Sequence, residues 1–422
     1  MSRRPSHLAR LLAILLVAGA VAIGCQASAS PSGTPSAEQA TSSVQEQEQS
    51  PWDAIFSGFL PWQPGSAQDE AADESDSSQK DATPQHAAAL GMLAEHTRYA
   101  SLTDTEKTVY DAILAGLRDH DDAISFSSSG VDTDRLGDIL YDVLFDNPDI
   151  FWASSSASWE LSGGTLVLHP VYFYGRADAE AMQASIDATV EDITANSLAG
   201  ADTDAKKALA LSKWIAANTT YNDEDADAEQ NIDSVFSGHV SVCAGYSKAL
   251  SYLLTKCGID SLVITGNATN SDGVAAAHAW VLAELDGMLT YLEPTWMDSD
   301  GTALCFEYFG MSDEECSRMH EADGGNDVSG LEVVSDHIAS YTASSSTYSR
   351  DWAASCIRDA ASQGSTMASF VLEDASAHDA LMADVQGALM SDALAGTQYE
   401  SQSSFQYIDN ETMHAVTLIF SS

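Results

Sequence analysis

Apolar positions recur along the chain in two patterns, one typical of helices and one typical of strands. The helical pattern predicts five helices. The first helix follows TDTE at Thr103–Glu106, a capping box in which the two side chains bond to each other's backbone N–H groups. The second ends before Pro148, because proline disfavours helical geometry in the residue that precedes it. The predicted helices cover residues 109–117, 136–144, 178–197, 209–215 and 243–257.

Short apolar runs bounded by turn residues predict strands between these helices. SLVITGN, AAAHAWVLAEL and LTYLEPTW follow one another from 261 to 296, the last two joined by a tight DGM turn, so we expect antiparallel neighbours. Near the C-terminus, SFVLEDAS, an alanine-rich helix and FQYIDNETMHAVTLIF predict a small β-α-β-β module in which DNET turns a hairpin. TLVLHPVYFYG, at 165–175, is a further strand, and the mixture of elements predicts an α+β fold.

Composition divides the chain into five parts. Residues 1–24 place three arginines before fourteen apolar or small residues, which is typical of an export signal and is short for a membrane span. A tether rich in Ser, Ala, Gln and acidic residues follows at 25–84 and ends at Thr83 and Pro84, a helix cap and first-turn proline. We expect three folded parts after it, at 85–200, 201–325 and 326–422.

The sequence AIGC at the end of the signal resembles the lipobox of bacterial lipoproteins, in which Cys25 would receive the lipid. We therefore expect an extracytoplasmic protein that contacts the bacterial cell membrane only through a lipid anchor. A secreted protein with an incidental cysteine is the alternative. No later stretch approaches eighteen consecutive apolar residues.

Charge narrows the classes of partner. The chain has 17 Lys and Arg residues against 63 Asp and Glu, giving a formal net charge of −46 at pH 7. Self-repulsion of this size makes nucleic acid and anionic lipid poor partners. A solvated acidic coat is the simplest interpretation of the excess.

Cys243 opens the last predicted helix, in SVCAGYS. Unpaired N–H groups at a helix start favour a thiolate, although free cysteines are more often buried structural residues. Apart from Cys25 the exported chain has five cysteines, so at least one stays unpaired. Cys257 would lie about 20 Å from Cys243 along the helix, too far for a disulfide. A bond between Cys305 and Cys316 remains open.

His278 and Glu293 follow Cys243 on the two predicted antiparallel strands. Nucleophile, base and orienting carboxylate are the three groups that an activated thiol requires. Each has a simpler interpretation, since single histidines are usually structural and a glutamate before proline is usually exposed. Their order and placement together favour a catalytic site.

VCAGYSKALSYLLTKCGI, HAW and YLEPTW resemble the transglutaminase-like superfamily, and the likeness extends from Ala205 to about Glu321. The resemblance implies a papain-like core, with a cysteine-bearing helix packed on an antiparallel sheet and a Cys-His-Asp triad. Cys243 matches the nucleophile, His278 the base, and Glu293 the position normally filled by Asp. Other residues named by the resemblance or by proximity are Asp286 and Asp298 as alternative carboxylates, and Tyr221, Trp280 and Trp296 as cleft residues.

The resemblance implies cysteine acyl transfer on amide bonds of peptides or proteins, with water or an amine as acceptor. The expected partner is a peptide or protein substrate, which the envelope location suggests is a cell-wall peptide. A catalytically weak scaffold that binds a wall or protein ligand is the alternative. We expect no cofactor and no metal, because the chain lacks phosphate-loop, C-x-x-C and H-E-x-x-H motifs.

Overall fold

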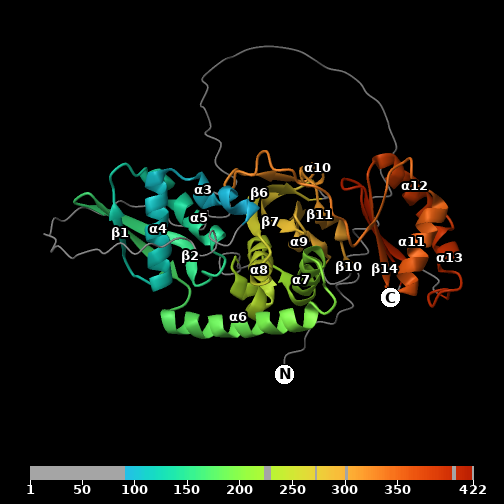
Figure 1. Ribbon diagram of the computed structural model, residues 1–422, viewed down its shortest axis with the longest axis horizontal. Helices are drawn as coiled ribbons and strands as arrows, with labels where there is room; N and C mark the ends of the chain where they lie inside the picture. The colour runs from blue at the N-terminus through green and yellow to red at the C-terminus, as the bar shows by residue number, and fades with distance from the viewer. Residues whose placement is uncertain (1–90, 223–229, 271–272, 300–302, 402–404, 421–422) are drawn as a thin grey trace, which may run out of the picture. The chain divides into compact units, whose positions relative to one another are not determined.

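A computed structural model describes residues 91–222, 230–270, 273–299, 303–401 and 405–420 (Figure 1). The predicted export signal, the predicted lipidation site at Cys25, the predicted tether and the predicted helix start at Thr83 and Pro84 lie outside these ranges. Within them, no helix has both the length and the apolar content needed to cross a membrane. The predicted α+β fold class is confirmed: helices pack on three separate sheets of three, five and four strands.

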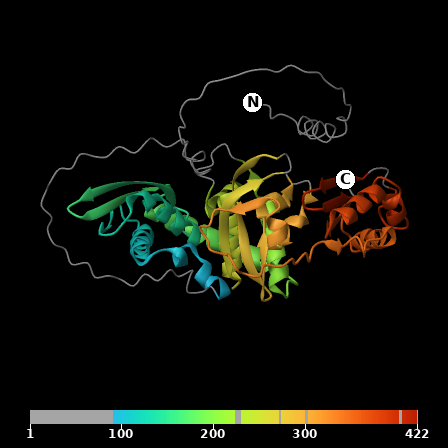
Figure 2. The same ribbon diagram turned by 90° about the horizontal axis from the view of Figure 1, so that it is seen from above.

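The first sheet belongs to the N-terminal part and has the order β1-β3-β2, with antiparallel neighbours. Its long β2–β3 hairpin is seen clearly in Figure 2. Helix α4 begins at the predicted capping box, in which both the Thr103 and the Glu106 hydrogen bonds form. The elements are η1 (Met92–His96), α3 (Arg98–Ser101), α4 (Asp104–Asp119), β1 (Ile124–Ser127), η2 (Thr133–Arg135), α5 (Leu136–Asp146), β2 (Ala153–Ser162) and β3 (Thr165–Tyr172).

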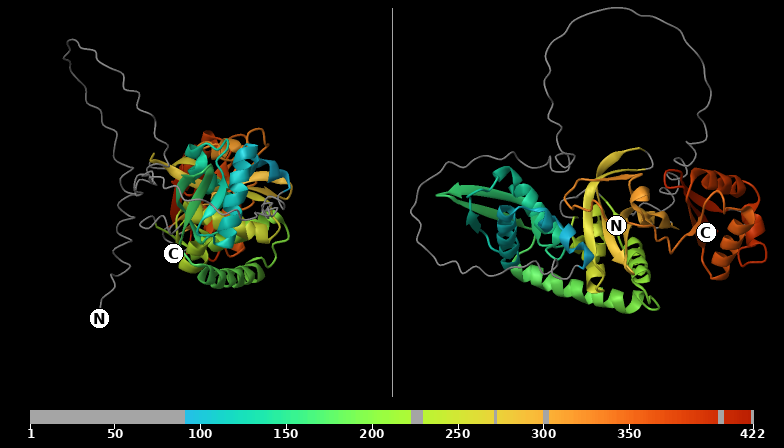
Figure 3. Two further views of the ribbon diagram at one scale, coloured as in Figure 1. Left: turned by 90° about the vertical axis from the view of Figure 1, so that its left-hand side faces the viewer. Right: turned by 45° about the horizontal axis from the view of Figure 1, so that its top comes forward.

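Three helices lead into the central sheet, and Figure 3 shows the first, α6, as one long helix. Helix α8 is buried along most of its length and packs on β6 and β7, and its buried residues include the polar Ser247, Lys248 and Ser251. The elements are α6 (Arg176–Ser197), α7 (Asp204–Asn218), β4 (Thr220–Tyr221), the π-helical turn η3 (Ser234–Gly238), β5 (Val240–Ser241) and α8 (Cys243–Lys256).

The central sheet is antiparallel throughout, in the order β11-β8-β7-β6-β12. The predicted hairpin of residues 275–296 forms β7 and β8, and the DGM turn places Asp286 and Gly287 at positive φ. The elements are β6 (Ser261–Thr269), β7 (Ala275–Leu285), β8 (Met288–Leu292), α9 (Pro294–Met297), β9 (Asp298–Ser299), β10 (Ala303–Leu304), η4 (Phe306–Tyr308), β11 (Phe309–Met311), α10 (Asp313–Cys316) and β12 (His320–Ala322).

Arg98 connects the N-terminal helices to the central sheet. Its side chain is only 3% exposed, pairs with Asp142 of α5 at 3.2 Å, and donates a hydrogen bond to Thr265 of β6. A buried guanidinium needs such partners, because an unpaired buried charge costs several kcal/mol. Helix α5 is thereby held against the sheet that carries the candidate site.

The C-terminal module contains the predicted strands and hairpin, but two helices, α12 and α13, stand where the sequence predicted one, and two further elements precede the pattern. Strand β14 pairs with β16, and β16 with β15, as the predicted hairpin requires. One face of the sheet packs on the module's helices, while Val371, Met413 and Ala415 join the central core. The elements are β13 (Tyr341–Ala343), α11 (Arg350–Ser362), β14 (Met367–Leu372), α12 (Ala375–Val385), α13 (Leu389–Leu394), β15 (Gln406–Asn410) and β16 (Ala415–Ile419).

Strand β12 approaches β6 closely at Gly266, where a Cβ atom would lie 2.0 Å from the Glu321 carbonyl oxygen. We predict that Gly266→Ala lowers the free energy of unfolding by about 1–3 kcal/mol, because the backbone of β12 has to shift. Urea denaturation followed by tryptophan fluorescence measures the change. Gly137→Ala on α5, where nothing lies within 4 Å, is the matched control and should be neutral or slightly stabilising. Equal stability of the two variants would contradict the close approach.

Candidate functional site

Cys243 and His278 come together where α8 meets the central sheet. Cys243 is the first residue of α8, and its half-exposed side chain is hydrogen-bonded to His278 of β7. His278 Nε2 lies 2.7 Å from the Glu293 carboxylate, so Nδ1 is the ring atom that faces the sulfur. The ring is therefore held between the thiol and the carboxylate, with its side chain only 8% exposed.

Both carboxylate oxygens of Glu293 have partners. Glu293 follows β8 and caps the short helix α9, where Oε1 accepts the backbone N–H groups of Thr295 at 2.7 Å and Trp296 at 3.2 Å. Oε2 is the oxygen that meets His278, and the side chain is fully buried. The extra methylene relative to Asp is accommodated because the helix start holds the end of the carboxylate.

Charge pairing controls the protonation of this pair. Burial alone would lower the pKa of His278, but the Glu293 carboxylate and then Cys243 outweigh it and raise the pKa to about 10. Burial alone would raise the pKa of Glu293, but His278 and then His320 hold it well below its ordinary value. At neutral pH the pair is an imidazolium and a carboxylate.

The predicted aromatic residues lie at different distances from the imidazole. Trp296 stacks on His278 with ring centres 4.8 Å apart, and Trp280 is buried with its ring centre 6.5 Å away. Tyr221 is 44% exposed on β4, and its ring lies 6.5 Å from that of Tyr246 on α8. Trp296 therefore covers the imidazole directly, whereas the Tyr221 ring faces that of Tyr246.

The two alternative carboxylates serve other purposes. Asp286 accepts the backbone N–H groups of Asp204 and Ala205, so it caps the start of α7. Asp298 accepts a hydrogen bond from the Tyr246 hydroxyl at 3.1 Å. Neither is the carboxylate on His278, and Glu293 occupies that position.

Two further residues belong to the site and were not identified from the sequence. His320 on β12 is buried, with Nε2 3.5 Å from Glu293 Oε2 and its ring 4.8 Å from that of Trp296. Tyr141 on α5 interacts electrostatically with Cys243 and packs beside Ala244. The only sequence signal for His320 was its place in EYFGMSDEECSRMH, inside the region of resemblance. For Tyr141 there was none, because the sequence of α5 shows only helical periodicity.

The cysteines other than Cys243 are structural thiols in the described part of the chain. In the described part of the chain none of Cys257, Cys305, Cys316 and Cys356 forms a disulfide, so the open possibility of a Cys305–Cys316 bond is not realised. Burial raises the pKa of Cys316 well above its ordinary value and that of Cys356 to about 11.

A cavity of about 310 Å³ lies beside the pair and is lined partly by Trp296. Asp298 and Asp409 give it a negative lining, whereas burial raises the pKa of Glu307, the third acidic residue there, and Asn410 of β15 brings the C-terminal module to its edge. Asn410 Nδ2 donates to the Tyr308 hydroxyl at 2.9 Å, and the Tyr308 ring meets Trp296 edge-on. The C-terminal module thus shapes the space next to the candidate site.

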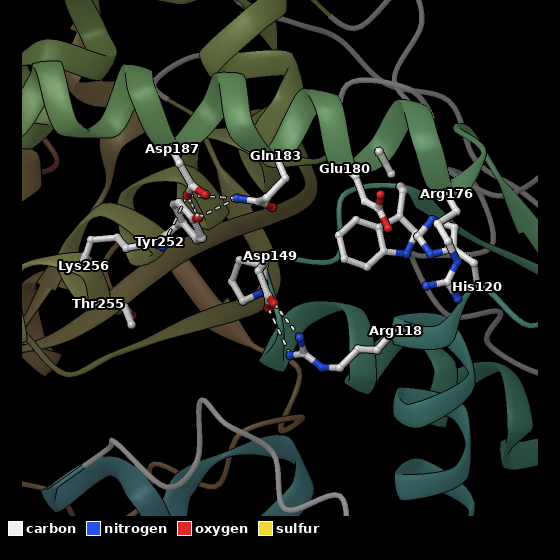
Figure 4. A pocket seen from close by; sticks show the side chains of 13 residues that line it. Arg118, His120, Asp149, Arg176, Glu180, Gln183, Asp187, Tyr252, Thr255 and Lys256 are labelled. Carbon is white, nitrogen blue, oxygen red and sulfur yellow. Dashed lines mark hydrogen bonds and ion pairs between the residues drawn. The ribbon is translucent and has the colours of Figure 1, made fainter.

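A larger pocket of about 610 Å³ lies elsewhere, lined by residues of α4, α6 and α8 (Figure 4). Arg118 pairs with Asp149 at 2.8 Å, and Lys256 lies 3.5 Å from Asp187. These cations already have acidic partners, and none of the lining residues is a cysteine. The pocket is therefore separate from the Cys243 chemistry.

Comparison with known proteins agrees with this geometry. Residues 191–298 match the sequence model of the Transglutaminase-like superfamily, and this range contains Cys243, His278 and Glu293. The chain contains a transglutaminase-like domain. The match covers the helices and strands that bring the three residues together, α7 through α9.

Two solved structures, a TGase and a candidate cysteine protease, have low overall similarity to this chain. A TGase crystal structure has 15% sequence identity and a TM-score of 0.25, covering 41% of this chain and 50% of that one. A candidate cysteine protease from Cytophaga hutchinsonii has 10% identity and a TM-score of 0.23, covering 43% of this chain and 66% of that one. The chain thus spans half of the first structure and less than two thirds of the second. None of the curated proteins matches the chain.

The His278–Glu293 ion pair in the transglutaminase-like domain should determine the pKa of His278. In Glu293→Gln the pKa of His278 should fall from about 10 towards or below 6.5, because the charge that favours the imidazolium is gone and burial remains. NMR of the His278 ring protons measures it. Glu314→Gln, at a glutamate whose side chain is 87% exposed, is the matched control and should leave His278 unchanged. A His278 that titrates alike in both variants would contradict the pairing.

The same pair predicts how stability depends on pH. A raised folded pKa means that the His278 contribution is complete below its unfolded value of 6.5 and is lost as pH rises through about 10. The lowered pKa of Glu293 means that its contribution is present above 4.5 and is lost as pH falls. The melting temperature of the wild type should therefore fall more than that of Glu293→Gln as pH rises from 6.5 to about 10. Parallel curves for the two proteins would be the opposite result.

Proposed function

We propose that this protein is a thiol acyl transferase or hydrolase that acts on amide bonds of peptides or proteins. The supporting observation is one imidazole placed between a half-exposed cysteine at a helix start and a fully buried carboxylate. This arrangement activates a sulfur nucleophile and supplies a proton for the leaving amine.

The reaction proceeds in two stages. The Cys243 thiolate attacks the amide carbonyl, and the N–H groups at the start of α8 stabilise the oxyanion. His278 gives its Nδ1 proton to the departing amine, leaving a thioester on Cys243 and a neutral imidazole. In the second stage water or an amine attacks the thioester, His278 takes the proton of that acceptor, and the free thiolate returns.

Glu293 keeps His278 in the required orientation and tautomer. By accepting the Nε2 proton it leaves Nδ1 directed at the sulfur, which is the role of the carboxylate in a triad. Trp296 stacks on the imidazole and shields the hydrogen bond from water. A glutamate therefore supplies the orientation that an aspartate gives in the more usual triad.

The acidic cavity supports substrates or acceptors that carry a positive charge. Its carboxylates lie beside Trp296, so an ammonium group is favoured there electrostatically. A lysine side chain, as leaving group or as acceptor, meets this requirement. Nucleic acid is not a partner in this proposal, because the chain is strongly acidic.

The location proposed from the sequence defines where the substrate would be found. A lipid on Cys25 would anchor the mature protein to the outside of the bacterial cell membrane, with the 25–84 tether between membrane and enzyme. Cell-wall peptides and extracytoplasmic proteins are then the accessible amides.

Trapping the thioester tests the activity. Incubation with envelope peptides should leave an acyl adduct on Cys243, detected by intact-mass and peptide mass spectrometry, and Cys243→Ala should show none. Cys356→Ala, at a buried thiol of α11, is the matched control and should form the adduct normally. Adding a primary amine should release an amide product if transfer operates, and hydrolysis alone should release the acid. Equal labelling of Cys243→Ala would overturn the proposal and favour a binding scaffold.

Alkylation tests the role of the imidazole without a known substrate. Peptide mapping after brief treatment with iodoacetamide at pH 7 should show Cys243 modified before Cys316 and Cys356, since buried protonated thiols react slowly. His278→Ala should slow the alkylation of Cys243 at least about tenfold, and any acyl transfer by about 10²–10⁴-fold. Unchanged alkylation of Cys243 in His278→Ala would show that the two side chains do not act together.

A further inference from the structure

A second histidine, His320 at the start of β12, also faces the Glu293 carboxylate. His320 Nε2 lies 3.5 Å from Glu293 Oε2, while His278 Nε2 lies 2.7 Å from the same oxygen. The ligand atoms of all three residues lie within 4.8 Å of one another, and the side chains are 8%, 0% and 1% exposed for His278, Glu293 and His320. The acyl-transfer mechanism gives His320 no task.

The hydrogen bonding of His320 leaves one nitrogen with a lone pair. Its Nδ1 lies 3.2 Å from the Cys316 carbonyl oxygen, which can only accept, so Nδ1 carries the proton. When the ring is neutral, Nε2 has a lone pair that faces the Glu293 carboxylate 3.5 Å away. A metal ion between this nitrogen and the carboxylate is attracted to both.

The ligands fit zinc in type and in number. Two imidazoles and one carboxylate form a known protein ligand set for Zn²⁺, whereas Ca²⁺ and Mg²⁺ prefer oxygen. The His320 Nδ1–H bond to a backbone carbonyl is the kind of outer contact that orients a metal-binding histidine.

The distances between the ligand atoms are close to those of a tetrahedral zinc site. A tetrahedral zinc ion with bonds of about 2.0–2.1 Å holds its ligand atoms roughly 3.3 Å apart. The separation of His320 from Glu293 already agrees with this value. The separation of His278 from Glu293 has to widen by roughly 0.6 Å to reach it, and the largest separation in the cluster, 4.8 Å, has to narrow by roughly 1.5 Å.

We propose that His278, Glu293 and His320 form a zinc-binding site that competes with the catalytic pairing. Zinc takes the position of the Nε2 proton of His278, which is released to water, and the imidazole keeps its Nδ1 proton towards Cys243. With a thiolate at Cys243, the buried group changes from one net negative charge to none. A His278 held by zinc can no longer exchange protons with the leaving amine and the acceptor, so zinc inhibits acyl transfer.

The acidic cavity provides the approach for the ion. It is lined by Trp296, which stacks on His278, and by Met319, the neighbour of His320. Its carboxylates raise the local concentration of cations, as negatively lined clefts generally do. Zinc binding stands on these residues alone, whereas inhibition rests on the proposed acyl transfer.

Zinc competition with a chromophoric chelator tests the site in the full-length chain. We expect one high-affinity Zn²⁺ per molecule, unchanged in Cys243→Ala, because sulfur is not a ligand. His320→Gln should weaken this binding at least about 100-fold, which is more than the loss of an outer-shell contact causes. His337→Gln, at a buried histidine paired with Glu315 at 3.0 Å, is the matched control and should bind as the wild type does.

Two results would overturn the site. Equal zinc affinity in His320→Gln and the wild type would assign the binding to surface carboxylates or to other thiols. If His320→Gln does not fold, as judged by circular dichroism, the Co²⁺-substituted wild type decides: a tetrahedral spectrum without a thiolate-to-cobalt band supports the site, and a thiolate band contradicts it. These outcomes are independent of the thioester test, whose failure would remove acyl transfer and leave zinc binding intact.

Discussion

The buried carboxylate of Glu293 is the constraint on which the rest of the site depends. An isolated carboxylate in a protein interior costs several kcal/mol, so the chain has to bring partners to both oxygens. One oxygen receives backbone N–H groups at the start of α9, and the other faces His278 and His320. Removing any partner leaves part of a charge uncompensated, which is why the position of the His278 imidazole is tightly determined.

These partners come from separate segments that the central sheet brings together. His278 lies within β7, α9 follows β8, and His320 begins β12 on the far side of β6. Strand β12 can reach this position because Gly266 of β6 has no side chain in its way. The sheet order therefore converts three distant stretches of sequence into one buried cluster, with Cys243 delivered to it by α8.

Much of this arrangement was predictable from local pattern. Cys243 begins a strongly apolar helix, and His278 and Glu293 lie on a hairpin whose DGM turn fixes the pairing of β7 with β8. The capping box of α4 and the C-terminal hairpin were equally clear, because turn and cap residues act on their immediate neighbours.

The remainder depended on long-range packing. Strand β12 has three residues, and no periodicity distinguishes so short a segment or shows that it pairs with β6, so His320 could not be assigned. Tyr141 has an unremarkable place in an amphipathic helix, and only the packing of α5 against Ala244 brings it to Cys243. No sequence motif indicated a metal site, because the three residues proposed to bind zinc come from separate segments and share no fixed spacing.

The central proposal is that Cys243 is an activated nucleophile under the control of His278. A crystal structure of the protein after reaction with a peptidyl electrophile that resembles an acylating amide tests this most directly. We predict a covalent bond from Cys243 Sγ, the former carbonyl oxygen directed at the N–H groups that begin α8, and His278 still within hydrogen-bond distance of Glu293. A label on another cysteine, or a His278 ring turned away from both Cys243 and Glu293, would contradict the account.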